Sequence, residues 1–118
     1  MSSPPRASEP RQFDVFWASL PSPVGRRPVL LFGRTGSYAY LSRVLVVEIT
    51  TTIRGIPQEV ALGKREGLPR SCVANLETIR TIPRGCLTTR IGRVRHAKQL
   101  DIKRALGHVL GWPELTSL

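Results

Sequence analysis

Two short polar clusters in this sequence have side chains suited to phosphate chemistry. Gly25-Arg26-Arg27-Pro28 places two guanidinium groups after a flexible glycine, and Thr50-Thr51-Thr52 ends an apolar run with three hydroxyl groups. Guanidinium groups bind phosphate with paired donors, and preorganised donors stabilise charge that develops on a reacting phosphate. RNA cleavage suits these residue types, because the 2′-OH of the substrate can itself be the nucleophile. The alternative interpretations are a solvated pair of loop charges and threonines chosen for a strand end.

Other catalytic chemistry has little support in the residues. The two histidines, His96 and His108, fall on a predicted helix, and Cys72 and Cys86 have no partner at metal-ligand spacing. We expect both cysteines to be buried as small apolar side chains and both histidines to lie at the surface or at a helix seam. The sequence contains neither a P-loop nor a nucleophile elbow. We therefore expect no metal and no cofactor.

The charge of the chain predicts a polyanionic partner. Lys and Arg number 18 against 8 acidic residues, which gives a net charge of +10. The stretch Arg80–Arg104 is the most basic, and it is either a surface that faces a polyanion, a docking face for an acidic partner, or a solvated surface away from both. No apolar run approaches the ~20 residues of a membrane span, and no signal peptide is recognisable. A cytoplasmic protein is expected.

Short strands must position the two clusters. The first residues, Met1–Arg11, read as a disordered tail, and a single domain is expected over residues 12–114. If the strands that begin at Pro28 and Val44 are neighbours, both clusters lie at one end of the sheet. The predicted strands, rich in β-branched and apolar residues, are Phe13–Ala18, Pro28–Phe32, Val44–Ile49, Gln58–Leu62, Cys72–Asn75, Thr78–Ile82 and Leu87–Ile91.

One helix is predicted near the end of the chain. Gly111 fits a left-handed helix stop, and Pro113 prevents continuation. The start near Arg95–Ala97 lacks a capping side chain and carries cations, so we expect the helix to fray or begin late. Its apolar face has helical spacing and comprises Ile102, Ala105, Leu106, Val109 and Leu110. Strands followed by one helix predict a small, mostly antiparallel β barrel with a helix packed on it.

Several segments, in order, resemble the MazF/PemK family of toxin endoribonucleases. Together they span roughly residues 12–111. The segments that carry the resemblance are Asp14–Leu20, Gly25–Leu30, Ile49–Val60, Gly67–Val73, Leu76–Ile82, Ile91–Arg93 and the terminal helix Ala105–Gly111. The resemblance implies an SH3-like barrel, a homodimer, and metal-independent cleavage of single-stranded RNA or mRNA. It also implies an acidic antitoxin that occupies the RNA groove.

The resemblance also assigns roles to residues. Arg27 matches the catalytic arginine of the family, and Thr50 matches its catalytic threonine. The remaining candidates for RNA binding lie in or beside the matching segments and are Arg26, Thr51, Thr52, Arg54 and Arg80.

The chain departs from the family pattern at three places. The loop Pro21–Gly25 is shorter than in many members, so cleavage specificity is not carried over. Phe13 replaces the usual glycine before the first strand, and Arg95-His96 replaces a capping Ser-Pro at the helix start. Two other functions stay open at this point: a gyrase poison of the CcdB type with the same fold, and a basic nucleic-acid-binding barrel without activity.

Overall fold

A computed structural model describes residues 9–118, so most of the predicted tail, residues 1–8, lies outside the described part. The strands are β1 (Asp14–Ser19), β2 (Arg26–Leu31), β3 (Arg43–Thr50), β4 (Glu59–Leu62), β5 (Cys72–Asn75), β6 (Arg80–Pro83) and β7 (Leu87–Arg93). Two helices follow, α1 (His96–Leu110) and α2 (Pro113–Thr116). Short 3-10 turns occupy the connections Thr35–Ala39, Lys64–Glu66, Leu76–Thr78 and Arg84–Cys86.

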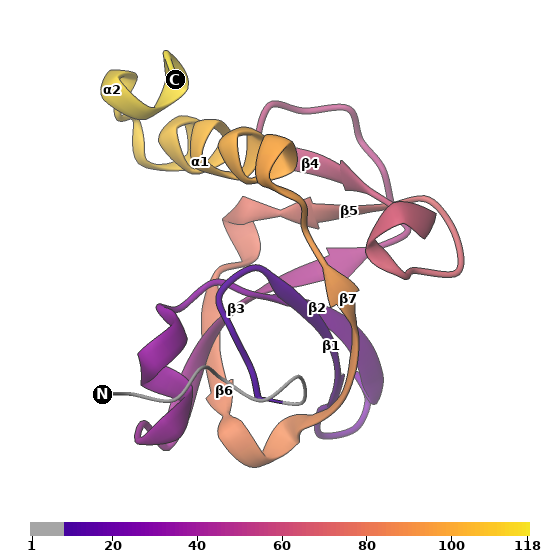
Figure 1. Cartoon of the computed structure of the whole chain (residues 1–118). Coiled ribbons are helices and arrows are strands. Elements are labelled where there is room, and N and C mark those ends of the chain that lie inside the picture. The colour runs from indigo at the N-terminus through magenta and orange to yellow at the C-terminus, as the bar shows by residue number, and fades with distance from the viewer. Residues whose placement is uncertain (1–8) are drawn as a thin grey trace.

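The strands form one curled antiparallel sheet, which confirms the predicted fold class. The order is β4-β5-β3-β2-β1-β7, and β6 pairs with β3 beside this path. In Figure 1, β1, β2, β3, β6 and β7 curl into an open barrel, and α1 lies across β4 and β5 at one end. β3 is the central strand that its β-branched run predicts, because it pairs with β2, β5 and β6.

The two faces of β3 contribute to two separate cores. Val47 and Ile49 belong to the core that includes Ile102 and Ala105 of α1. The alternate residues, such as Val46, belong to a core inside the curl of the sheet. A strand whose two faces are both covered needs apolar residues at successive positions, which accounts for its nearly continuous apolar run.

The arginine pair lies inside a strand, whereas the sequence analysis placed it just before the strand. β2 begins at Arg26, two residues before the expected start at Pro28. Arg26 pairs with Ser19 of β1, while Pro28 pairs with Trp17. The pairing of β2 with β3 begins only after Pro28, so the missing N–H of the proline leaves no β3 partner unpaired.

Phe13 adopts a backbone conformation that usually requires glycine. Its φ is 74°, and it occupies the position where the resembling family has glycine. The ring is buried in the core that includes Leu30 and Ile102. The backbone is tied on both sides, because the N–H of Phe13 donates to the carbonyl of Leu31 and its carbonyl accepts from Val94. Burial of the aromatic ring opposes the cost of the left-handed conformation, which is about 1–2 kcal/mol.

Helix α1 begins and ends within the predicted limits. It starts at His96, so of the two expectations, fraying or a late start, the late start is wrong; the predicted lack of a side-chain cap at Arg95 is confirmed. Gly111 ends the helix with a φ of 68°, as predicted. Beyond it, Pro113 opens the short helix α2, which the sequence did not predict because proline was read only as a stop.

Arg95→Ser is expected to stabilise the protein. A serine hydroxyl at this position accepts a hydrogen bond from the first turn, and the change removes a cation from the positive end of the helix dipole. The expected gain in the free energy of unfolding is about 1 kcal/mol, measured by urea denaturation. Arg95→Gln is the control, because it removes the charge without supplying a cap. Equal stability of the two variants would contradict the capping argument.

Candidate active site

The pairing of β2 with β3 brings the arginine and threonine clusters together, as the sequence analysis expected if these strands are neighbours. Val29 is paired with Glu48, and the same antiparallel register, continued by two residues, places Arg27 opposite Thr50. The start of one strand and the end of the other therefore meet at the same edge of the sheet. Hydroxyl and guanidinium groups lie there on adjacent strands.

Two hollows open at this edge, and both are lined by Arg27 and Thr50. The first has a cavity volume of about 180 Å³ and an apolar lining from Pro28, Ile49 and Cys72. Its polar lining comes from Arg26, Arg27, Thr50 and Thr51. The second hollow, of about 270 Å³, is lined by Arg27, Glu48, Thr50, Thr52, Arg54, Asn75 and Thr78. Arg27 and Thr50 thus stand between a partly apolar hollow and a polar one.

Glu48 forms an ion pair with Arg27 that the sequence analysis did not anticipate. Nη1 of Arg27 lies 3.6 Å from Oε1 of Glu48, and the side chains are 40% and 20% exposed. The backbone N–H of Glu48 donates to the hydroxyl of Thr78 at 3.1 Å. The sequence did contain a signal for this residue: Glu48 is an acidic residue within the apolar run of β3, and it lies on the same strand as Thr50.

The segment after β3 is fixed by local hydrogen bonds. The hydroxyl oxygen of Thr50 accepts from the N–H of Thr52 at 3.1 Å. The carboxylate of Glu59 accepts from the backbone N–H groups of Arg54, at 3.0 Å, and Gly55, at 2.9 Å. These contacts leave the Thr50 hydroxyl hydrogen free to donate and hold Arg54 next to the polar hollow.

Trp17 and Arg26 form a stacked pair beside the first hollow. The guanidinium carbon of Arg26 lies 4.2 Å from the centre of the Trp17 ring, which is a cation–π contact. Both residues belong to one face of the β1–β2 pair, because Arg26 pairs with Ser19, two residues from Trp17. Trp17 was another site residue that the sequence analysis missed.

Cys72 and the two histidines lie as predicted, whereas Cys86 is less buried than predicted. Cys72 is buried, and burial raises the pKa of its thiol, with a smaller opposing effect of Arg70. The thiol therefore stays protonated at neutral pH and lines the first hollow as an uncharged group. Cys86 is half-buried, whereas His96 and His108 are exposed.

The basic stretch Arg80–Arg104 is not gathered at the two hollows. Arg80 is exposed on β6, pairs with Val46, and lines neither hollow. The buried carboxylate of Asp14 lies 3.5 Å from Nε of Arg90 and 3.1 Å from Nη1 of Arg93. Both arginines thus compensate a buried charge, which is a structural role.

The structure combines a barrel-like antiparallel sheet, a helix across its end and an Arg–Thr pair where β2 begins and β3 ends. The chain belongs to the family described as the PemK-like, MazF-like toxin of type II toxin–antitoxin systems, whose model matches residues 11–110. The match spans both hollows and α1. It confirms the resemblance found in the sequence.

Individual relatives agree with this family. The "Probable endoribonuclease MazF5" of Mycobacterium tuberculosis is 34% identical over 98 residues, which cover 82% of this chain and 89% of the relative. The solved structure of M. tuberculosis toxin MazF-mt6 has a TM-score of 0.78 at 30% identity and covers 83% of this chain and 96% of its own. A mycobacterial endoribonuclease solved in complex with its cognate antitoxin has a TM-score of 0.77 at 31% identity, with coverages of 88% and 97%.

Proposed function

We propose that this protein is the toxin of a type II toxin–antitoxin system and cleaves single-stranded RNA as an endoribonuclease. The observation that carries the proposal is the meeting of Arg27 and Thr50 between two adjacent hollows. Family membership supports the same function, because the relatives are named endoribonucleases. Neither a gyrase poison nor an inactive nucleic-acid-binding barrel gains support from these relatives.

The linings of the two hollows support a division of the substrate between them. The polar hollow offers the cations Arg27 and Arg54 and the hydroxyls of Thr50 and Thr52 to a phosphate and a ribose. The first hollow, with its apolar lining and the adjacent Trp17 ring, suits a base. Access to a base favours a single strand, because duplex RNA hides base edges in a deep, narrow groove.

In the proposed reaction, the 2′-oxygen of the substrate attacks the adjacent phosphorus and the bond from phosphorus to the 5′-oxygen breaks. Arg27 binds the non-bridging phosphate oxygens, and the hydroxyl of Thr50 donates to them as negative charge develops. A guanidinium is a poor base at neutral pH, because it stays protonated. Glu48, the carboxylate that lines the polar hollow, takes the proton from the 2′-OH. The leaving 5′-oxygen takes a proton from water, which gives a 2′,3′-cyclic phosphate and a 5′-OH.

The proposed partners and location follow from charge and family. An acidic antitoxin would be attracted to a chain of net charge +10, and one of the similar solved structures contains a cognate antitoxin. Among residues 9–118, the structure has no helix long and apolar enough to cross a membrane. We place the protein in the cytoplasm, with mRNA as a substrate, and keep the homodimer, the binding roles of Arg26, Thr51, Thr52, Arg54 and Arg80, and cleavage without metal as predictions.

Thr50→Val is the mutation that tests the proposed function at the threonine cluster. Valine keeps the β-branched shape at the end of β3 and removes only the hydroxyl, so the fold should survive. Loss of one preorganised donor is expected to lower the rate of single-stranded RNA cleavage by about 10²-fold. Thr51→Val is the matched comparison; because Thr51 is a predicted binding residue, this variant should lower RNA affinity but keep the cleavage rate of the bound RNA. An inactive Thr51 variant beside an unchanged Thr50 variant would show that the wrong threonine was chosen.

A further inference from the structure

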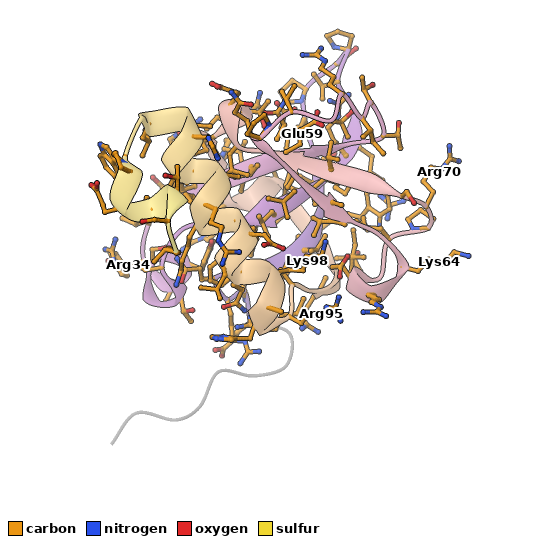
Figure 2. The ribbon with its side chains drawn as sticks, turned by 90° about the horizontal axis from the view of Figure 1, so that it is seen from above. Arg34, Glu59, Lys64, Arg70, Arg95 and Lys98 are labelled. Atoms are coloured by element: carbon orange, nitrogen blue, oxygen red, sulfur yellow. The ribbon has the colours of Figure 1, made fainter. Side chains whose placement is uncertain are left out.

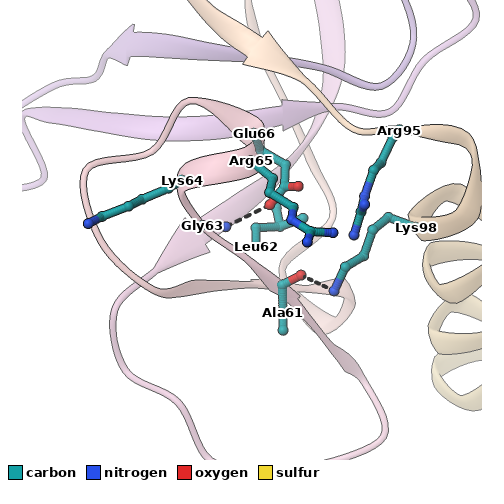
Figure 3. Close-up of a pocket in the computed structure, with 8 residues that line it drawn as sticks. All are labelled: Ala61, Leu62, Gly63, Lys64, Arg65, Glu66, Arg95 and Lys98. Atoms are coloured by element: carbon teal, nitrogen blue, oxygen red, sulfur yellow. Dashed lines mark hydrogen bonds between the residues drawn. The ribbon is translucent and has the colours of Figure 1, made fainter.

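Four cationic side chains line a pocket at the start of α1 that is separate from the two hollows. The pocket has a volume of about 240 Å³ and is called the basic pocket below; its cations are Lys64, Arg65, Arg95 and Lys98. Figure 2 shows Lys64 on the connection between β4 and β5, with Arg95 and Lys98 at the start of α1. In Figure 3 the heads of Arg65, Arg95 and Lys98 converge, whereas Lys64 points away.

These four cations form no ion pair with a carboxylate in the described part of the chain, residues 9–118. Glu66 also lines the pocket, but it is buried and accepts the N–H of Gly63 at 2.7 Å. Lys98 is held in place by donation from Nζ to the carbonyl of Ala61 at 2.7 Å. The four cations outnumber the single carboxylate of the pocket and repel one another, and a bound anion lowers this repulsion.

Close backbone contacts fix the chain segments that carry Arg65 and Arg95 relative to each other. A Cβ on Gly67, whose φ is 88°, would lie 2.5 Å from the carbonyl oxygen of Ile91, and a Cβ on Gly92 would clash with the carbonyl of Glu66. The connection that carries Arg65 is thus packed directly on β7, which leads into Arg95. The backbone of the pocket therefore needs little rearrangement when a ligand binds.

The basic pocket lies next to the proposed cleavage site along the sheet. Leu62 of β4 lines the basic pocket, and its antiparallel partner Cys72 of β5 lines the first hollow. The segment that joins these two residues carries an additional exposed arginine, Arg70. A strand of RNA that leaves the first hollow past this segment therefore meets cations before it reaches the start of α1.

We infer that the basic pocket binds a backbone phosphate of the RNA strand, several nucleotides from the cleaved bond; this inference rests on the proposed function. Guanidinium groups from two elements match the tetrahedral oxygens of a phosphate better than a flat surface of lysines would. An RNA in the hollows is covalently continuous with its flanking phosphates, so the nearby pocket favours RNA over a separate acidic protein. The cations at the start of α1 then lower the stability of the helix but raise the affinity of the protein for long RNA.

The test compares two fully 2′-O-methylated single-stranded RNA pools, a hexanucleotide and a dodecanucleotide, which bind but are not cleaved. Arg65→Gln and Arg95→Gln are each expected to weaken dodecanucleotide binding about tenfold. Each should also reduce the slope of log affinity against log salt by about 0.7, the value for one phosphate contact with a single strand. Hexanucleotide binding should not change. Lys103→Gln, an exposed cation elsewhere on α1, is the control and should change neither.

The outcomes separate this inference from the proposed function. If wild type binds both pools and the arginine variants bind the dodecanucleotide as wild type does, the basic pocket is not an RNA site, although the proposed function stands. If the variants lose affinity only for poly-glutamate, the pocket takes an acidic protein segment, and if they lose only inorganic phosphate, it takes free phosphate; either result overturns the inference. If wild type binds neither pool, both proposals fail.

Discussion

Arg27→Lys is expected to lower the rate of RNA cleavage by about 10²–10³-fold while RNA affinity falls much less. Lysine keeps the positive charge and can still pair with Glu48, 3.6 Å from Arg27 in the structure, so the fold and the local charge balance should persist. It loses the planar pair of donors that binds two phosphate oxygens at once. Replacing arginine by lysine should therefore slow the step in which negative charge develops on the phosphate.

Single-turnover cleavage together with binding of a 2′-O-methylated RNA measures this split. Arg26→Lys is the matched comparison, because Arg26 lines the first hollow only and stacks on Trp17. It should keep most of the cleavage rate. A wild-type rate for Arg27→Lys would exclude the bidentate role of the guanidinium.

Glu48→Gln is expected to have the largest effect, a loss of about 10²–10⁴-fold in the cleavage rate. The amide is nearly isosteric but cannot accept the proton of the 2′-OH. Single-turnover cleavage of single-stranded RNA by the wild type and by the variant measures this loss.

Glu77→Gln is the control for Glu48, because Glu77 is an exposed carboxylate outside both hollows. It should retain the rate. A Glu48→Gln variant that cleaves at the wild-type rate would show that the proton of the 2′-OH goes elsewhere.

The sequence predicted the framework of this fold because its signals are local. The β-branched run at Val44–Ile49 and the stop at Gly111 depend on backbone preferences of single residues, and both are found as predicted. The start of β2 was misplaced because Pro28 looked like a strand opener. The strand tolerates Pro28 because pairing with β3 begins only after this residue, and the sequence does not show where that pairing begins.

The candidate site was predictable only as far as neighbouring residues could indicate it. The Arg26-Arg27 and Thr50–Thr52 clusters are visible as short motifs, and the β2–β3 pairing joins them. Glu48, Trp17 and Cys72 come from three different strands and reach the site through pairing and side-chain direction. Single residues that lie this far apart in the sequence do not form a recognisable motif. The roles of Arg90 and Arg93 likewise depended on Asp14, which is far from both in sequence.

The most direct test of the central claim is cleavage of single-stranded RNA by the purified protein in the presence of EDTA, with the new ends identified chemically. We predict internal cuts that leave a 5′-OH and a 2′,3′-cyclic phosphate or its hydrolysis product. The double variant Arg27→Lys with Thr50→Val should give no cuts while its circular dichroism and unfolding midpoint match wild type. Undiminished cutting by that folded double variant, or intact RNA after incubation with wild type, would contradict the account.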